Sequence, residues 1–247
     1  MCCLFLAASS TVAIAQTNVV DLVNPIIGTN GMGHTFPGAC VPFGLVQLSP
    51  DTDTIPHNVD GKYQPRSYEY CAGYQHKDSS IVGFSHTHFS GTGHSDLGDI
   101  LIMPTTGTLK LNPGTATNPD GGYRSRFSHD TEISRPGYYE VMLADYGVKA
   151  QLTTTQRAGI HKYTYPTNSE NQRIILDMIH GIYNYDGKVL WTNIRVENDT
   201  LVTGYRITNG HVPTILISPC LSPNRSRITD AKRKRKLIIG AVMPSSI

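Results

Sequence analysis

Apolar and polar residues alternate with a period of two in much of the second half of the chain. The clearest stretches are residues 148–154 and 201–207, where apolar, aromatic or small side chains recur at every second position. Successive side chains of a strand point to opposite faces, so this period predicts strands with one face turned toward a core. Shorter apolar or β-branched runs at 174–179 and 189–196 predict two more strands.

Turn-forming residues separate these runs. They are Asp145-Tyr146-Gly147, Asp186-Gly187 and Glu197-Asn198-Asp199. Short strands with regular turn signals are typical of sandwiches and barrels. The 23 glycines and 15 prolines also favour turns and strands over long helices. The sequence therefore predicts an all-β fold, a β-sandwich.

The part of the chain before Tyr139 has a different pattern. It is dense in glycine, histidine and aromatic residues, and Pro37, Pro42 and Pro50 exclude long helices there. Loops carried by a rigid scaffold are where binding residues gather. We therefore expect structure mainly from the second half and function mainly from the first.

The two ends divide the chain further. Residues 1–15 resemble a secretory signal peptide, with an apolar stretch from Leu4 to Val12 before the small-residue cleavage site Ala13-Ile14-Ala15. No segment is long and apolar enough for a transmembrane helix. We expect residues 16–210 to form the folded domain of an exported protein, either periplasmic or extracellular.

Residues 211–247 lack a strand or helix period, and Pro219 and Pro223 interrupt them. We interpret this segment as an aberrant tail produced by a frameshift or truncation near Gly210. It carries seven Lys/Arg and one Asp, a balance of +6, so the rest of the chain carries −4 of the net +2. Because residues 1–210 carry a net negative charge, they are poorly suited to neutralise phosphates, which argues against nucleic-acid binding.

Six of the ten histidines lie between His34 and His94. If His86 and His88 are on a strand, they share a face, which raises the possibility of a metal site completed by His94, Asp96 or Asp99. The alternative is that these histidines line a polar pocket or bond to backbone. An H-x-H pattern is weak evidence by itself, so we favour the second interpretation and assign no metal ligands.

Asp96 and Asp99 could also form a pair of catalytic carboxylates. Glycoside hydrolysis needs two carboxyl groups at a set separation, which a sequence spacing of three does not establish. Aspartate in a glycine-rich turn more often bonds to its own backbone. We assign no catalytic residues.

Residues 67–75 hold Tyr68, Tyr70 and Tyr74 around Cys71. Aromatic faces beside polar groups suit a sugar ring, while a half-buried strand with the three tyrosines on one face is the alternative. No activating base stands next to Cys71, so a nucleophilic role is disfavoured. A disulfide between Cys40 and Cys71 remains open.

Several strings in order resemble one family, glycoside hydrolase family 92, the calcium-dependent exo-acting α-mannosidases. The strings are VNPIIGT, GHTFPGA, VPFGLVQLSPDT, YEYCAGYQ, GFSHTHFSGTGHSDLGDILIMPTTG and GYRITNG. The resemblance spans roughly Val20 to Gly210. It implies a galactose-mutarotase-like β-supersandwich that precedes a helical (α/α)₆ barrel, and that barrel is absent from this chain.

The resemblance also implies a function. Members remove terminal α-mannose from mannose-rich glycans with inversion, using a Glu acid, an Asp base and calcium that come mainly from the helical domain. We therefore expect no bound calcium in this fragment alone, and we expect the missing helical domain and mannose-containing glycans as its partners. By match to the motifs, the substrate-binding candidates are Phe36, Tyr70, Cys71, His86, His88 and Asp96.

Two other function classes stay open. The domain could be a stand-alone carbohydrate-binding module, which binding of mannose without turnover would indicate. A His/Asp metallohydrolase is less consistent with the residues and would show chelator-sensitive ester or phosphate cleavage.

Overall fold

Strands dominate the computed structural model. It describes residues 18–53, 55–91, 97–185, 187–198, 200–209, 215–221 and 236–242. The helical elements are one-turn segments: α1 (Arg66–Glu69) and the 3₁₀ turns η1 (Val19–Leu22), η2 (Pro119–Gly121) and η3 (His129–Thr131). The all-β prediction is confirmed.

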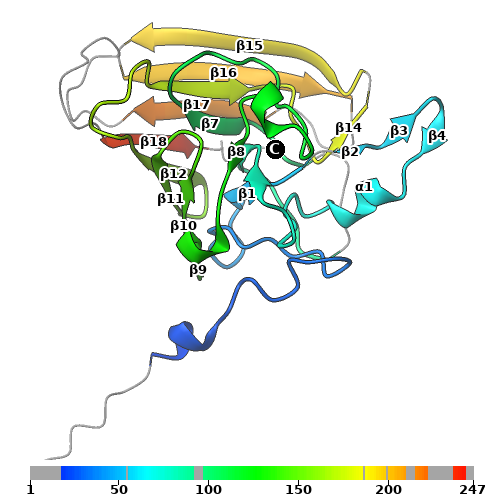
Figure 1. Ribbon diagram of the computed structural model, residues 1–247. Coiled ribbons are helices and arrows are strands. Elements are labelled where there is room, and N and C mark those ends of the chain that lie inside the picture. Colours follow the sequence, from blue (N-terminus) through cyan, green and yellow to red (C-terminus); the bar gives the residue numbers. More distant parts are fainter. Residues whose placement is uncertain are drawn as a thin grey trace, which may run out of the picture.

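The longest sheet has eight antiparallel strands in the order β15-β16-β17-β18-β12-β11-β10-β9. In Figure 1 it curves from β15 at the top down to β9. Its strands are β9 (Ile133–Arg135), β10 (Tyr138–Leu143), β11 (Val148–Thr154), β12 (Ala158–Thr164), β15 (Val189–Asn198), β16 (Leu201–Thr208), β17 (Ile215–Leu221) and β18 (Lys236–Val242).

A second antiparallel sheet has the order β1-β6-β7-β13. Its strands are β1 (Ser49–Asp51), β6 (Gly83–Ser85), β7 (Leu101–Thr105) and β13 (Arg173–Asp177). Three two-stranded pairs complete the fold: β2 (Ile55–Pro56) with β14 (Tyr183–Asn184), β3 (Asn58–Val59) with β4 (Lys62–Tyr63), and β5 (Ser80–Ile81) with β8 (Ser125–Arg126).

The main hydrophobic core joins the four-stranded sheet to the β10–β12 part of the long sheet. Phe84 of β6 lies with its ring centroid 6.5 Å from that of Tyr139 and 6.3 Å from that of Tyr163. The predicted alternation explains this face, because β11 is buried at Val148, Ala150, Leu152 and Thr154 and half-buried between them. The sandwich is therefore built by the period of two that the sequence displays.

The β15–β16 end of the long sheet follows the pattern less simply. In β16 the fully buried residues are Gly204 and Arg206, whereas Ile207, on the opposite face, is exposed. In β15 the side chain of Trp191 is 60% exposed and that of Val196 is 66% exposed. Apolar residues at this edge are therefore left uncovered within the described part of the chain.

Two predictions about the ends can be compared with the structure. The expectation that residues 211–247 contain no strand is wrong, because β17 and β18 lie there, between β16 and β12. Their sequences, ILISPCL and KLIIGAV, are nearly continuous apolar runs, which a search for alternation misses. The frameshift interpretation stays a prediction, and the proposed signal peptide, 1–15, lies outside the described residues.

Candidate functional site

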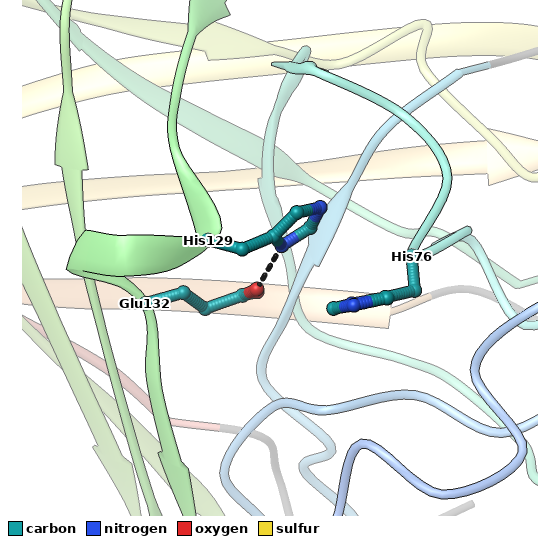
Figure 2. Close-up of side chains that lie close together, drawn as sticks. All are labelled: His76, His129 and Glu132. Carbon is teal, nitrogen blue, oxygen red and sulfur yellow. Dashed lines mark hydrogen bonds and ion pairs between the residues drawn. The ribbon is translucent and has the colours of Figure 1, made fainter.

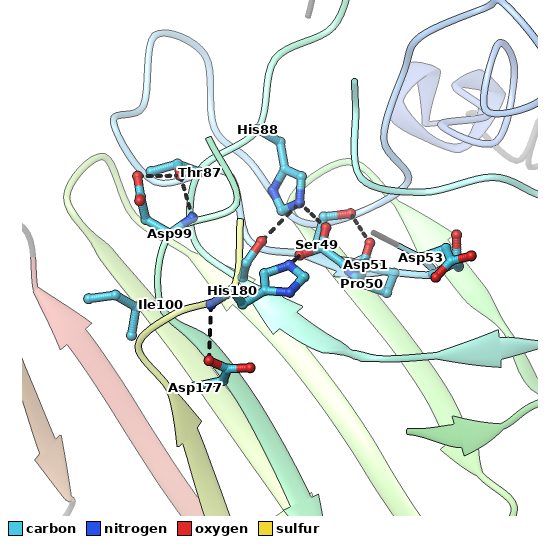
Figure 3. A network of polar contacts seen from close by, with 12 residues as sticks. Ser49, Pro50, Asp51, Asp53, Thr87, His88, Asp99, Ile100, Asp177 and His180 are labelled. Atoms are coloured by element: carbon cyan, nitrogen blue, oxygen red, sulfur yellow. Dashed lines mark hydrogen bonds and ion pairs between the residues drawn. The ribbon is translucent and has the colours of Figure 1, made fainter. Parts of the chain in front are cut away.

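A buried carboxylate lies at the end of β1, where loops from several parts of the chain meet (Figure 3). Asp51 is 1% exposed, and its two oxygens contact two histidines: Oδ1 is 2.8 Å from His88 Nε2, and Oδ2 is 2.7 Å from His180 Nε2. Both histidines are also buried. The two histidines therefore fix the orientation of the carboxylate.

The electrostatics of this cluster favour a charged carboxylate. Burial raises the pKa of Asp51, but the charge of His88 and the hydrogen bonds from both histidines outweigh it, so the pKa lies well below its ordinary range. The Nδ1 of His88 lies 2.7 Å from the carbonyl oxygen of Gln47. Both nitrogens of His88 therefore contact oxygen atoms, and these contacts fix the orientation of the ring.

Gly73 is required beside this pair. Its φ of +81° lies in the left-handed region, and a Cβ built there would lie 2.1 Å from Asp51 Oδ1 and 3.0 Å from His88 Nε2. Its carbonyl also accepts a hydrogen bond from the Thr52 amide at 2.9 Å. The glycine of the YEYCAGYQ string therefore permits the backbone to approach the carboxylate closely.

The loop that carries His34 and Phe36 is held to this region by Gln75. The side chain of Gln75 accepts from the Gly31 amide at 2.7 Å and donates to the Gly31 carbonyl at 2.9 Å. This brings the ring of Phe36 to 5.3 Å from the ring of His88, measured between centroids. Phe36 and His88, both sequence candidates, are thus direct neighbours.

His34 adds an unsatisfied polar atom to the same loop. Its ring lies edge-on to that of Tyr68 at 4.6 Å, and within the described part of the chain its buried Nε2 has no hydrogen-bond partner. Its φ of 53° is unusual for a residue other than glycine. A buried, unpaired ring nitrogen on a strained loop indicates a place where a polar ligand group could bind.

Tyr70 and Cys71 lie at the end of α1, which shows that the strand alternative for residues 67–75 is wrong. The hydroxyl of Tyr70 donates to Asp78 Oδ1 at 3.2 Å. Cys71 is fully buried in a small apolar cluster with Ile182 and Tyr183. No disulfide joins Cys40 to Cys71, so the open possibility of a bridge between them is not realised.

His86 is separated from the other candidates. The strand β6 ends at Ser85, so the condition for a shared face with His88 is not met. The His86 ring enters the core, with Nδ1 2.8 Å from the Ile100 carbonyl and Nε2 3.0 Å from Nε2 of His161. Burial lowers the pKa of His86 to about 4, so the neutral ring occupies this position.

The acidic candidates have different outcomes. Asp96 lies outside the described residues. Asp99 is buried in an ion pair with Arg206, and its Oδ2 accepts a hydrogen bond from Thr87 Oγ1 at 3.0 Å. Since Arg206 belongs to β16, this ion pair connects the loop after His88 to that strand.

Sequence reasoning missed several contributors to the site. His180 and Arg206 reach the site from positions far along the chain. His180 lies in none of the family-like strings, and Arg206 lies in GYRITNG but was not chosen as a candidate. A third group, His76, His129 and Glu132, places three potential metal ligands within 4.8 Å of one another (Figure 2). Its two nitrogen ligands do not suit calcium, which prefers six to eight oxygens.

The sequence has clear relatives. The profile of the glycosyl hydrolase family 92 N-terminal domain matches residues 22–221. The chain belongs to this family. The match extends past Gly210 through β17, so the predicted end of family-like sequence at Gly210 is wrong.

Solved structures place the family 92 domain within larger proteins. A family 92 α-mannosidase from Bacteroides thetaiotaomicron, in complex with mannoimidazole, is 37% identical, with a TM-score of 0.77 over 91% of this chain and 32% of that one. An inverting mannosidase from the same organism shares the fold, at 23% identity and a TM-score of 0.65 over 94% of this chain and 32% of that one.

A curated relative, an uncharacterized secreted glycosidase from Arthroderma benhamiae, is 29% identical over 65% of this chain and 19% of its own length. The chain thus spans about a third or less of these relatives. No helix in the described ranges is long and apolar enough to cross a membrane.

Proposed function

We propose that this domain forms part of the mannose-binding site of an exported exo-α-mannosidase, which removes terminal α-mannose from mannose-rich glycans with inversion. The observation that carries the proposal is the 37% identity, over nearly the whole chain, to an α-mannosidase in complex with mannoimidazole. The relative described as a secreted glycosidase supports export.

The loop cluster around Phe36 supplies suitable chemistry for a sugar. The half-buried ring of Phe36 offers an apolar face for the C–H groups of a pyranose. The Nε2 of His34, which has no hydrogen-bond partner among the described residues, offers a polar atom for a hydroxyl. The bonds between Asp51, His88 and His180 keep the surface beneath Phe36 rigid. Rigid support favours binding because the protein loses less conformational entropy when the sugar binds.

The remaining candidates act less directly in this proposal. Tyr70 and Cys71 support the loop from behind, since the hydroxyl of Tyr70 is bonded to Asp78 and Cys71 is buried. His86 belongs to the core, where its ring joins the two sheets through His161. Its contribution is to hold in place the segment that leads to His88.

The reaction itself needs more than this domain provides. Inversion requires an acid and a base about 6.5–9.5 Å apart, with room for a water molecule between them and the sugar. We assign both carboxyl groups and the calcium to the helical part of the intact enzyme. The chain alone should therefore show no mannoside turnover, and robust turnover by it would contradict this assignment.

A chimera tests the proposal. Residues 22–221 would replace the matching segment of the Bacteroides thetaiotaomicron α-mannosidase, which is 37% identical. The chimera should cleave an aryl α-mannoside, release β-mannose as the first product in NMR, and lose activity with a calcium chelator. Phe36→Ala in the chimera should lower kcat/KM roughly tenfold, equivalent to about 1.4 kcal/mol.

The matched control is Tyr63→Ala, which removes an exposed aromatic ring from the β3–β4 pair outside the cluster and should leave kcat/KM unchanged. A chimera that melts cooperatively but is inactive, or that prefers another terminal α-sugar, would count against mannose recognition. Equal kcat/KM for the Phe36→Ala chimera and its parent would exclude Phe36 from the sugar site.

A further inference from the structure

Two histidines and a glutamate meet on the side of the domain where η3 ends (Figure 2). His129 lies in η3, Glu132 caps its C-terminal end, and His76 comes from the loop after α1. The rings of His76 and His129 are 3.9 Å apart between centroids, and His129 Nδ1 lies 2.6 Å from Glu132 Oε2. One ligand atom of each residue lies within 4.8 Å of the other two.

The glutamate of this cluster has a buried carboxyl group. Its side chain is 3% exposed, and among the described residues its ion-pair partner is a histidine, with no lysine or arginine within salt-bridge distance. Two phenols bond to it: Tyr74 donates to Oε1 at 2.9 Å, and Tyr139 donates to the same oxygen at 2.6 Å. A buried carboxylate of this kind is stabilised by a nearby cation.

We propose that His76, His129 and Glu132 bind a divalent transition-metal cation, with Zn²⁺ as the probe. Two imidazoles and a carboxylate are ligands that zinc accepts, whereas calcium and magnesium prefer oxygen alone. Three protein ligands leave a fourth position of the tetrahedron for water. The 37% exposure of the His129 side chain gives the cation a route from solvent.

The rearrangement that zinc needs is small. Ligand atoms at about 2.0–2.1 Å from a tetrahedral zinc lie about 3.3 Å from one another. His129 Nδ1 and Glu132 Oε2 would separate by less than an ångström from their present 2.6 Å. The third ligand atom would move inward from at most 4.8 Å, which a rotation of the His76 side chain can provide.

The two tyrosines supply the outer layer of the site. Hydrogen bonds from Tyr74 and Tyr139 orient the glutamate, as the partners of metal-bound carboxylates commonly do. Burial and the Glu132 charge raise the pKa of both phenols, so they remain donors at neutral pH. The bound cation would join the loop after α1 to η3 and stabilise the domain by mass action.

Titration of the 247-residue chain with Zn²⁺ in a calorimeter tests the proposal. We expect one zinc ion to bind to the cluster and to raise the melting temperature. His129→Ala, which changes a partly exposed residue, should weaken this binding at least about 100-fold while leaving the metal-free melting temperature near its original value. Tyr139→Phe should weaken binding about tenfold, as loss of an outer-layer bond does.

His57→Ala is the matched control, because His57 is a half-buried histidine outside the cluster, and zinc binding should be unchanged. Co²⁺ in place of zinc should give a tetrahedral visible spectrum without a thiolate charge-transfer band. No zinc binding by the chain, unchanged affinity in His129→Ala, or a thiolate band would each overturn the proposal.

Discussion

The buried pair of histidines in the core predicts a specific dependence of stability on pH. The neutral ring of His86 donates from Nδ1 to the Ile100 carbonyl, so its Nε2 is the acceptor for the N–H of His161. A proton added to His86 would place a charge in the interior and break the bond to His161. Burial therefore lowers the pKa of His86 to about 4 from the ordinary 6.5.

The sign and the size of the effect follow from this pKa. Between pH 6.5 and pH 4 the unfolded chain binds the proton and the folded chain does not, so stability falls as the pH is lowered through this window. The difference in pKa corresponds to about 3 kcal/mol. Above pH 6.5 the neutral ring is present in both states, and this penalty is absent.

His86→Asn isolates this contribution, because asparagine keeps a donor for the Ile100 carbonyl and cannot titrate. At pH 7 the variant should be less stable than the original chain by about 1–3 kcal/mol, from the lost bond and the cavity. Between pH 7 and pH 4 that deficit should shrink by about 3 kcal/mol and then vanish or reverse. Urea unfolding followed by far-UV circular dichroism at several pH values measures it.

Leu152→Val serves as the control. Leu152 lies opposite His161 in the β11–β12 register and is buried, but carries no titrating group. Its loss of stability should be the same at every pH. If the deficit of His86→Asn is also constant from pH 7 to pH 4, the core histidine does not titrate as argued and the reasoning fails.

Three further substitutions have defined outcomes. Gly73→Ala should destabilise the domain by at least about 2 kcal/mol in urea unfolding, because its Cβ would overlap Asp51; wild-type stability would refute the close approach. Asp99→Asn should cost about 3–5 kcal/mol in the same assay by leaving the Arg206 charge buried without its carboxylate, and a loss below about 1 kcal/mol would contradict the burial of this pair. Gln75→Leu should speed proteolytic cleavage between residues 28 and 38, and an unchanged cleavage rate would show that the Gly31 bonds do not hold the loop.

Strand periodicity predicted the scaffold well where one face is buried. β11 alternates as the sequence does, because its outer residues meet solvent and its inner ones meet the core. The rule failed in β16, where the buried face holds Arg206 rather than the apolar residues. A guanidinium can occupy that face only because Asp99 lies beside it, and this contact joins residues that are 107 positions apart.

The site was predictable in its local parts. The GHTFPGA and GFSHTHFSG strings supplied Phe36 and His88, and folding places their rings side by side. Neither spacing nor composition marks His180, which reaches Asp51 from 129 positions away. The same holds for His76 and Glu132, since nothing local in the sequence shows that the loop after α1 meets η3.

The exposed edge at β15 has a practical consequence for fluorescence work. Trp191 is the chain's sole tryptophan, and its side chain is 60% exposed in the folded domain. Unfolding would therefore change its emission little, even while the core around Phe84 is lost. A shift of that emission to shorter wavelength would instead report that another surface has covered β15, so one intrinsic probe follows assembly separately from folding.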